Sequence, residues 1–149
     1  MTYTRFFSMI AASTLIMYGL MYLNTFQMDH IFFSQTRAWM AVYMGGIMAI
    51  VMLAFMWGMY EGQGTKVGII AGGALVFAAS LYLVRSQDTV DDVAWMKAMI
   101  PHHSIAILTS GRANIADPRV QQLADDIIKA QLKEIDEMKA LIADLEGNS

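Results

Sequence analysis

The sequence contains no cysteine, which excludes disulfides, cysteine-based zinc sites, iron–sulfur clusters and haem attachment through a CxxCH motif. Charged residues are also scarce, at 15% of the chain against 56% hydrophobic residues, and this balance is far from that of an average soluble domain. The formal net charge is −3 and no basic cluster is present. We therefore expect no binding of nucleic acid.

The few charges are unevenly placed along the 149 residues. Residues 1–85 are almost devoid of them, whereas residues 86–149 hold most of the acids. The first part contains three uncharged apolar stretches, at about 6–23, 38–60 and 67–84. Because roughly 20 such residues span the hydrocarbon core of a bilayer, we predict a three-span membrane anchor over residues 1–85 and a separate soluble domain over residues 86–149.

The number of spans determines which segments share a side of the membrane. With three spans, the loop at residues 24–37 and the C-terminal domain lie on the same side, so Met28 and His30 share a compartment with His102 and His103. The count of positive residues on the two sides is a tie. We expect the N-terminus inside, which makes the chain a multi-pass protein of the bacterial inner membrane with a periplasmic C-terminal domain.

Small residues in the second and third spans indicate how these spans pack. Gly68 and Gly72 have GxxxG spacing, and Gly45 and Ala49 lie at the corresponding spacing in the second span. Small residues let helices approach closely in lipid, and the short glycine-rich link EGQGTK makes these spans antiparallel neighbours. We expect the glycines to pack the two spans together rather than to form a homodimer.

Methionines recur at every fourth position through the second span. The series comprises Met40, Met44, Met48, Met52 and Met56. Each four-residue step drifts by about 40° on a helix of 3.6 residues per turn, so the series winds around the helix. This pattern favours packing and lipid contact over a conduit for copper.

The C-terminal domain is predicted to form two antiparallel helices. The first runs from about residue 89 to 114, and the second begins with Asp117 as N-cap and Pro118 as first helical residue and ends at Gly147. The apolar stripe of the second helix comprises Val120, Ala124, Ile127, Ile135, Met138, Ile142 and Leu145. Because two helices alone bury little, we expect a partner, which is a second copy of the chain, the membrane loop or another membrane protein.

Two adjacent histidines follow a proline in the segment MKAMIPHHSIAI of the first helix. Met96, Met99 and His103 lie on one stripe of that helix, whereas His102 lies about 100° around it. Pro101 removes an amide hydrogen and clashes with the carbonyl four residues earlier. We therefore expect the helix to kink or break there, which would bring the two imidazoles closer together.

The second helix offers Gln131, Glu134 and Met138 opposite these histidines, because the turn lies near residue 115. Thioether and imidazole ligands together favour copper. A structural zinc site prefers four nitrogen or thiolate ligands, and a di-iron bundle needs Glu-x-x-His repeats. The alternative is a buried hydrogen-bond network of His, Gln and Glu that only specifies packing.

Two motifs resemble a known family, the bacterial domain of unknown function family 305, which is ferritin-like and helical. They are the run Met99 to His103 followed by Ala106 and Ile107, and the pattern Gln131, Glu134, Ile135, Met138. The resemblance covers about residues 89–145, and the three-span part resembles membrane-anchored members. Some members are implicated in copper binding or copper tolerance outside the cytoplasm. The resemblance implies the ligands His102, His103, Met96, Met99 and Met138, with Glu134 as a ligand or as a group that orients one; many members have methionine where this sequence has Thr109.

The sequence thus predicts an all-α membrane protein with three transmembrane helices followed by a soluble antiparallel hairpin, half of a ferritin-like bundle. We expect it to bind copper and to act in metal handling as a non-enzymatic protein, with membrane lipid and a homo-oligomer or membrane-protein partner around it. No small-molecule substrate is implied. The alternative is an accessory or oligomerisation module in which the layer of His, Gln and Glu is structural.

Overall fold

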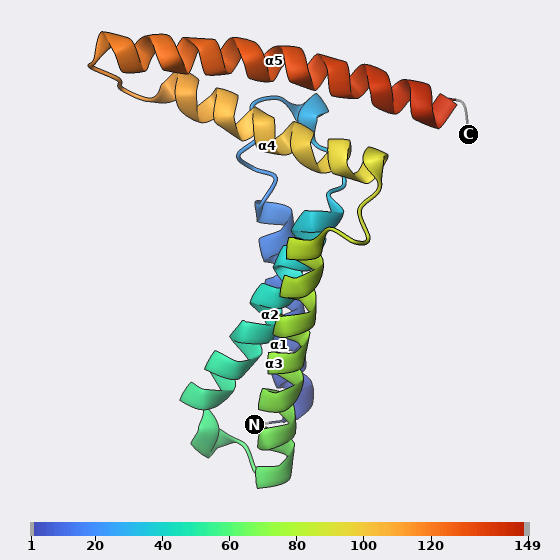
Figure 1. Cartoon of the computed structure of the whole chain (residues 1–149). Coiled ribbons are helices and arrows are strands. Elements are labelled where there is room, and N and C mark those ends of the chain that lie inside the picture. Colours follow the sequence, from blue (N-terminus) through green and yellow to red (C-terminus); the bar gives the residue numbers. More distant parts are fainter. Residues whose placement is uncertain (1, 148–149) are drawn as a thin grey trace. The chain divides into compact units, whose positions relative to one another are not determined.

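The computed structural model describes residues 2–147, and every regular element among them is a helix (Figure 1). The prediction of an all-helical chain is therefore confirmed. The elements are α1 (Tyr3–Leu20), the 3₁₀ turn η1 (Met28–His30), α2 (Gln35–Phe55), the 3₁₀ turn η2 (Trp57–Met59), α3 (Gln63–Ser86), α4 (Asp92–Arg112) and α5 (Pro118–Gly147).

The chain divides into two units. The N-terminal unit comprises Met1–Met21 and Thr36–Thr89, and the C-terminal unit comprises Tyr22–Gln35 and Val90–Ser149. The segment between α1 and α2 therefore belongs with α4 and α5 rather than with the helices that flank it in sequence.

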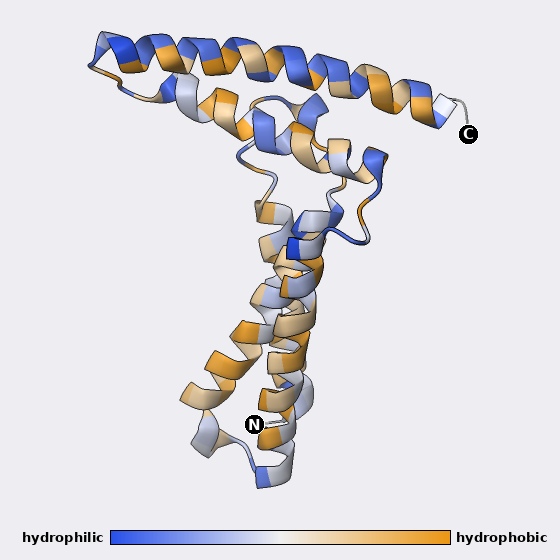
Figure 2. Ribbon diagram, viewed as in Figure 1, coloured by the Kyte–Doolittle hydropathy of each residue, from blue (hydrophilic) through white to orange (hydrophobic). Residues whose placement is uncertain are grey.

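Two helices of the N-terminal unit, α2 and α3, are long and apolar enough to cross a membrane, judged by length and composition alone. Both are coloured mainly towards the hydrophobic end of the scale in Figure 2. Helix α1, which covers most of the predicted first span, is not one of the two, because Arg5 and several hydroxyl-bearing side chains dilute its apolar residues. The three-span arrangement therefore stays a prediction.

Aromatic side chains join the start of α1 to the link between α2 and α3. The rings of Tyr3 and Tyr60 stack with centroids 5.1 Å apart, and Phe6 packs edge-on against Tyr60. The Tyr3 hydroxyl also donates a hydrogen bond of 2.6 Å to the Glu61 carbonyl. Since Phe6 is fully buried with Leu53 of α2, α1 begins where α2 ends, and the two helices run antiparallel.

Helices α2 and α3 meet at a glycine pair, but not at the pair that the sequence indicated. A Cβ on Gly46 would lie 2.9 Å from the Gly73 carbonyl oxygen, and a Cβ on Gly73 would lie 3.0 Å from the Gly46 carbonyl oxygen. These backbones touch because neither residue has a side chain. The prediction that α2 and α3 pack through small residues is right, but Gly68 and Gly72 have nothing within 4 Å of a Cβ position.

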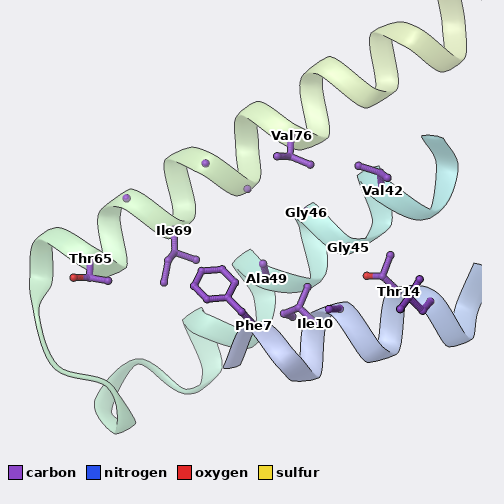
Figure 3. A pocket seen from close by; sticks show the side chains of 15 residues that line it. Phe7, Ile10, Thr14, Val42, Gly45, Gly46, Ala49, Thr65, Ile69 and Val76 are labelled. Atoms are coloured by element: carbon purple, nitrogen blue, oxygen red, sulfur yellow. The ribbon is translucent and has the colours of Figure 1, made fainter. Parts of the chain in front are cut away.

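Those two glycines instead line an apolar groove of about 780 Å³ within the N-terminal unit. Its walls come from three helices, with Phe7 and Ile10 of α1, Ala49 of α2 and Ile69 of α3 among the lining side chains (Figure 3). The GxxxG face of α3 is therefore open rather than packed against α2.

Helices α4 and α5 form the predicted antiparallel hairpin (Figure 1). The Asp91 carboxylate accepts a 2.7 Å hydrogen bond from the Ala94 amide and caps α4. Asp117 accepts a 2.8 Å hydrogen bond from the Arg119 amide just before α5, so the predicted start of the second helix is confirmed. Of the kink or break predicted at Pro101, the break is absent, because α4 continues through this residue, which is fully buried.

The apolar stripe predicted for the second helix is only partly buried. Ala124, Ile135, Met138 and Ile142 are buried, whereas Val120 is 48% exposed and Leu145 is 43% exposed. Gly111, near the end of α4, lies opposite Ile128, ten residues into α5. The first turns of α5 therefore extend past the end of α4, as Figure 1 shows, and Val120 has no facing helix.

Candidate functional site

The interface between α4 and α5 is an apolar layer that fixes the register of the two helices along their axes. Its buried members are Met96, Ile100, Ile107, Ile135, Met138 and Ile142, with Phe32, Val93, Met99 and Ile128 packed against them. Ile100 and Ile135 are almost completely inaccessible to solvent. This layer places the histidine segment of α4 beside the middle of α5.

His103 and Glu134 meet across the hairpin at the edge of this layer. The His103 Nε2 atom lies 2.7 Å from Glu134 Oε2, and its Nδ1 atom lies 3.0 Å from the Met99 carbonyl oxygen one turn earlier. The His103 side chain is 16% exposed and that of Glu134 is 51% exposed. The predicted meeting of an imidazole with this carboxylate is therefore present, at a rim that solvent reaches.

The contact with Met99 determines which nitrogen of His103 carries a proton. A carbonyl oxygen has no hydrogen to donate, so Nδ1 must be the donor in this hydrogen bond. In the neutral ring, Nε2 would then point a lone pair at the Glu134 carboxylate, and two lone pairs repel at this distance. The 2.7 Å between Nε2 and Oε2 is the length of a charge-assisted hydrogen bond, so a proton shared by the two atoms accounts for this contact.

The other predicted ligands are distributed between the surface and the interior. His102 is exposed, and its ring centroid lies 6.2 Å from that of His103 at an interplanar angle of 67°. Met96 and Met138 are only 5% and 7% exposed in the hairpin core, and Met99 packs against that core. The structure thus unites His103 with Glu134 and Met96 with Met138, but His102 does not point into the hairpin.

Among residues 2–147, no group of three or more His, Cys, Asp or Glu side chains is placed to hold a metal ion. A single hairpin therefore presents two adjacent donors, one imidazole and one carboxylate, with a second imidazole nearby on the surface. This set is smaller than the six-residue set that the family resemblance implies.

A second polar cluster in the C-terminal unit was not predicted. Ser104 is fully buried, and its hydroxyl oxygen accepts a 2.6 Å hydrogen bond from the Phe26 amide and lies 3.0 Å from His30 Nδ1. Lys139 of α5 donates to Asp29 at 2.6 Å. These contacts hold the segment Tyr22–Gln35 against the hairpin.

Burial lowers the pKa of His30 below its ordinary value, and the charge of Lys139 acts in the same direction, whereas Asp29 and Asp136 oppose it. A neutral His30 ring accepts the Ser104 hydroxyl hydrogen at Nδ1, while the Ser104 oxygen accepts from Phe26. The only sequence signal for this cluster was a single serine in an otherwise apolar run after the two histidines.

Comparison with known proteins identifies this part of the chain. Residues 81–148 match the family described as Domain of unknown function (DUF305). The C-terminal part of the chain is a DUF305 domain. The family resemblance predicted from the segments around His102 and Glu134 is therefore confirmed.

A viral protein also resembles this chain. It is "Uncharacterized protein L153" of Acanthamoeba polyphaga mimivirus, which is 44% identical over 64 residues, or 42% of each chain. The match therefore spans less than half of that relative's length. No solved structure matches the chain significantly.

Proposed function

We propose that this protein is a membrane-anchored metal-binding protein whose DUF305 domain holds copper at the His103–Glu134 pair, and that it acts in metal handling rather than in catalysis. One observation carries the proposal: His103 Nε2 lies 2.7 Å from a Glu134 carboxylate oxygen, while His103 Nδ1 lies 3.0 Å from the Met99 carbonyl oxygen. Metal-binding histidines characteristically donate their other ring N–H to a carbonyl or carboxylate, which fixes the tautomer and the ring orientation.

The spacing of these donors suits a first-row metal ion. Bonds of about 2.0–2.2 Å to nitrogen and oxygen, set at a right angle, would place the two donors about 2.9 Å apart. Among divalent ions, Cu²⁺ binds such nitrogen and oxygen sites most tightly. Exposed His102 is the nearest further imidazole, whereas Met96 and Met138 would join the ligands only if the hairpin opened.

The proposed location follows from the apolar helices. Helices α2 and α3 would cross the membrane with α1 as a third span, in contact with lipid. An N-terminus on the inner side of a bacterial inner membrane would then place the DUF305 domain in the periplasm. A periplasm-dependent reporter enzyme fused after Ser149 tests this orientation, and activity only of a cytoplasm-dependent reporter would contradict it.

Titration of the detergent-solubilised full chain with Cu²⁺ against a competing chelator tests the site. We expect His103→Gln and Glu134→Gln each to weaken binding about 10-fold or more, because each removes one of two adjacent donors. Glu137→Gln is the matched control, since Glu137 is an exposed carboxylate of the same helix. Equal affinity of all four proteins would show that this pair is not the copper site.

A second function is favoured by the absence of a larger ligand group among the described residues. In that case the His103–Glu134 pair is an ion pair that fixes the register of α4 relative to α5. The domain is then a non-enzymatic accessory or oligomerisation module. This second function predicts that His103→Gln lowers the stability of the metal-free protein. It also predicts that Cu²⁺ stabilises neither the wild type nor the His103→Gln variant. The metal-binding function predicts the reverse: Cu²⁺ raises the melting temperature of the wild type but not that of the variant.

A further inference from the structure

The segment between α1 and α2 carries a group of exposed, large apolar side chains. They are between 41% and 83% exposed and comprise Leu23, Phe26, Met28, Ile31 and Phe33. The segment contains no lysine or arginine, and its one acidic residue, Asp29, is paired with Lys139 at 2.6 Å. Neighbouring exposed apolar residues with so little charge among them mark a surface that binds another apolar surface.

The second half of this segment has one side buried on the hairpin and one side exposed. The backbone is extended at Ile31, and side chains of an extended chain point alternately to opposite sides. His30 and Ser34 are 3% and 1% exposed, and Phe32 packs against the hairpin core. Ile31 and Phe33, between them, are 41% and 68% exposed. These two apolar side chains therefore face away from the hairpin, on the side where contact with water would favour polar residues.

The segment is a compact loop whose two ends are joined. The Ser34 amide donates a 3.0 Å hydrogen bond to the Tyr22 hydroxyl, and Arg37 donates a 2.7 Å hydrogen bond to the Met21 carbonyl just outside the segment. Its η1 turn packs against α4 (Figure 1). Compact surface loops with close ends are Ω-loops, which are packed by their own side chains. We call Tyr22–Gln35 the Ω-loop; its contacts fix the orientation of its exposed side chains.

The length of chain between the Ω-loop residues and the helix ends limits how far they lie from the predicted spans. Leu23 is three residues beyond Leu20, the last residue of α1, and Phe33 is two residues before Gln35, the first residue of α2. An extended chain covers about 3.5 Å per residue, so these distances are at most about 10 Å and 7 Å. Each polar interface of a bilayer is about 5–8 Å thick. If α1 and α2 cross a membrane, both side chains are therefore tethered at the level of its interface.

We infer that Leu23, Ile31 and Phe33 insert into the lipid interface and hold the DUF305 domain at the membrane surface. The inference rests on the membrane location given in the proposed function and is independent of copper. A bilayer is the apolar surface that the two tethers already bring within reach, so no further protein is needed to cover these side chains. Because the Ω-loop has no basic residue, apolar contact drives the insertion and anionic lipid is not required.

The experiment uses the full chain in phosphatidylcholine vesicles, at fewer than one chain per vesicle so that a second copy is absent. The chain has no cysteine, so one introduced cysteine places an environment-sensitive fluorophore at a single position. Quenching by nitroxide-labelled phospholipid is compared with quenching by iodide on both sides of the bilayer. The variants are Leu23→Cys, Ile31→Cys and Phe33→Cys in the Ω-loop, Val51→Cys in α2, where Val51 is 47% exposed, and Glu137→Cys as matched control at an exposed position of the same domain.

We expect nitroxide at the lipid headgroup to quench the three Ω-loop labels several-fold more strongly than the label at Glu137, and iodide to quench them less. Ω-loop labels as open to iodide as the label at Glu137 would overturn the inference. Labels shielded from both quenchers would also overturn it, because protein rather than lipid would then cover the Ω-loop.

The label at Val51 separates this inference from the proposed membrane location. We expect it to be quenched most strongly by nitroxide near the end of the acyl chain. If it is, and the Ω-loop labels are open to iodide, the membrane anchor stands and only the inserted loop fails. If iodide reaches the label at Val51, α2 does not cross the bilayer, and the membrane anchor and the inserted loop both fail.

A further substitution tests whether the apolar side chains hold the Ω-loop in the lipid. We expect Phe33→Asp to make the label at Ile31 several-fold more accessible to iodide, because a carboxylate favours water over the interface. Gln27→Asp is the matched control, since Gln27 is an exposed polar residue of the same loop. Unchanged quenching in Phe33→Asp would show that the loop lies near the membrane without being held there by Phe33, which overturns the anchoring role.

Discussion

Replacement of Ser104 by alanine tests how the segment Tyr22–Gln35 is held on the hairpin. The hydroxyl of Ser104 is the shared partner of the Phe26 amide and of His30 Nδ1, at 2.6 Å and 3.0 Å. Ser104 is fully buried and His30 is 3% exposed, so water cannot replace the lost hydroxyl without a local opening. Alanine leaves two polar groups without partners.

An unsatisfied buried polar group costs about 1–3 kcal/mol, so we expect Ser104→Ala to destabilise the attachment of the segment by about 2–3 kcal/mol. The equilibrium constant for local opening of the segment rises accordingly, by a factor of about 30–150. Hydrogen exchange of the Phe26 amide measures this factor directly, because that amide is one of the two groups that lose a partner.

Thr109→Ala is the control, because the Thr109 hydroxyl bonds only to carbonyls of its own helix and is exposed. Its effect on exchange at Phe26 should be negligible. If Ser104→Ala leaves the exchange rate of Phe26 within a few-fold of the wild type, then the hydroxyl does not hold this segment, and the reasoning from buried hydrogen bonds is refuted.

Three further outcomes are expected. Because the pKa of His30 is lowered below its ordinary value of 6.5, the unfolded chain takes up the proton first, so the free energy of unfolding should be constant above neutral pH and fall as pH falls through 6.5; denaturant titrations should show a smaller fall in His30→Gln. Gly46→Ala should destabilise the helix pair by about 1–3 kcal/mol in thermal unfolding in detergent, because its Cβ would meet backbone atoms, whereas Gly68→Ala meets open space; equal effects would contradict the packing. Met96→Leu combined with Met138→Leu should leave Cu²⁺ affinity unchanged, because both sulfurs are buried, and a loss as large as that of His103→Gln would show that they are ligands.

The helices of the C-terminal unit could be predicted closely because their termini carry local signals. Asp117 and Pro118 mark the start of α5. The first helix was predicted to begin near residue 89, and α4 begins three residues later, at Asp92, with Asp91 as its cap. The sequence predicted a kink or a break at Pro101 and could not decide between them, because the local rule considers only the lost hydrogen bond and the clash. Helix α4 is not broken there, and Pro101 and Ile100 are fully buried, so tertiary packing favours a continuous helix.

The glycine contact shows a different limit of sequence reasoning. GxxxG spacing identified Gly68 and Gly72 as a close-packing face, but the close approach occurs at Gly46 and Gly73. Spacing along one helix gives the faces that are small, whereas the crossing point depends on the rotation of both helices. The sequence pattern does not specify that rotation. It therefore predicted correctly which helices pack together, but not which residues make the contact.

The candidate site shows the same division between local and tertiary information. The contact of His103 with Glu134 could be predicted because the position of the turn fixes which residues of two antiparallel helices lie opposite each other. Whether Met96 and Met138 are ligands depends on rotation, and the structure turns both thioethers into the core. Exposing one such side chain costs about 1.5–3 kcal/mol, so ligation by both would cost about 3–6 kcal/mol of the binding energy. Copper(I), which prefers thioethers, would therefore bind only with opening of the hairpin, whereas copper(II) could bind imidazole and carboxylate at the rim of the closed one.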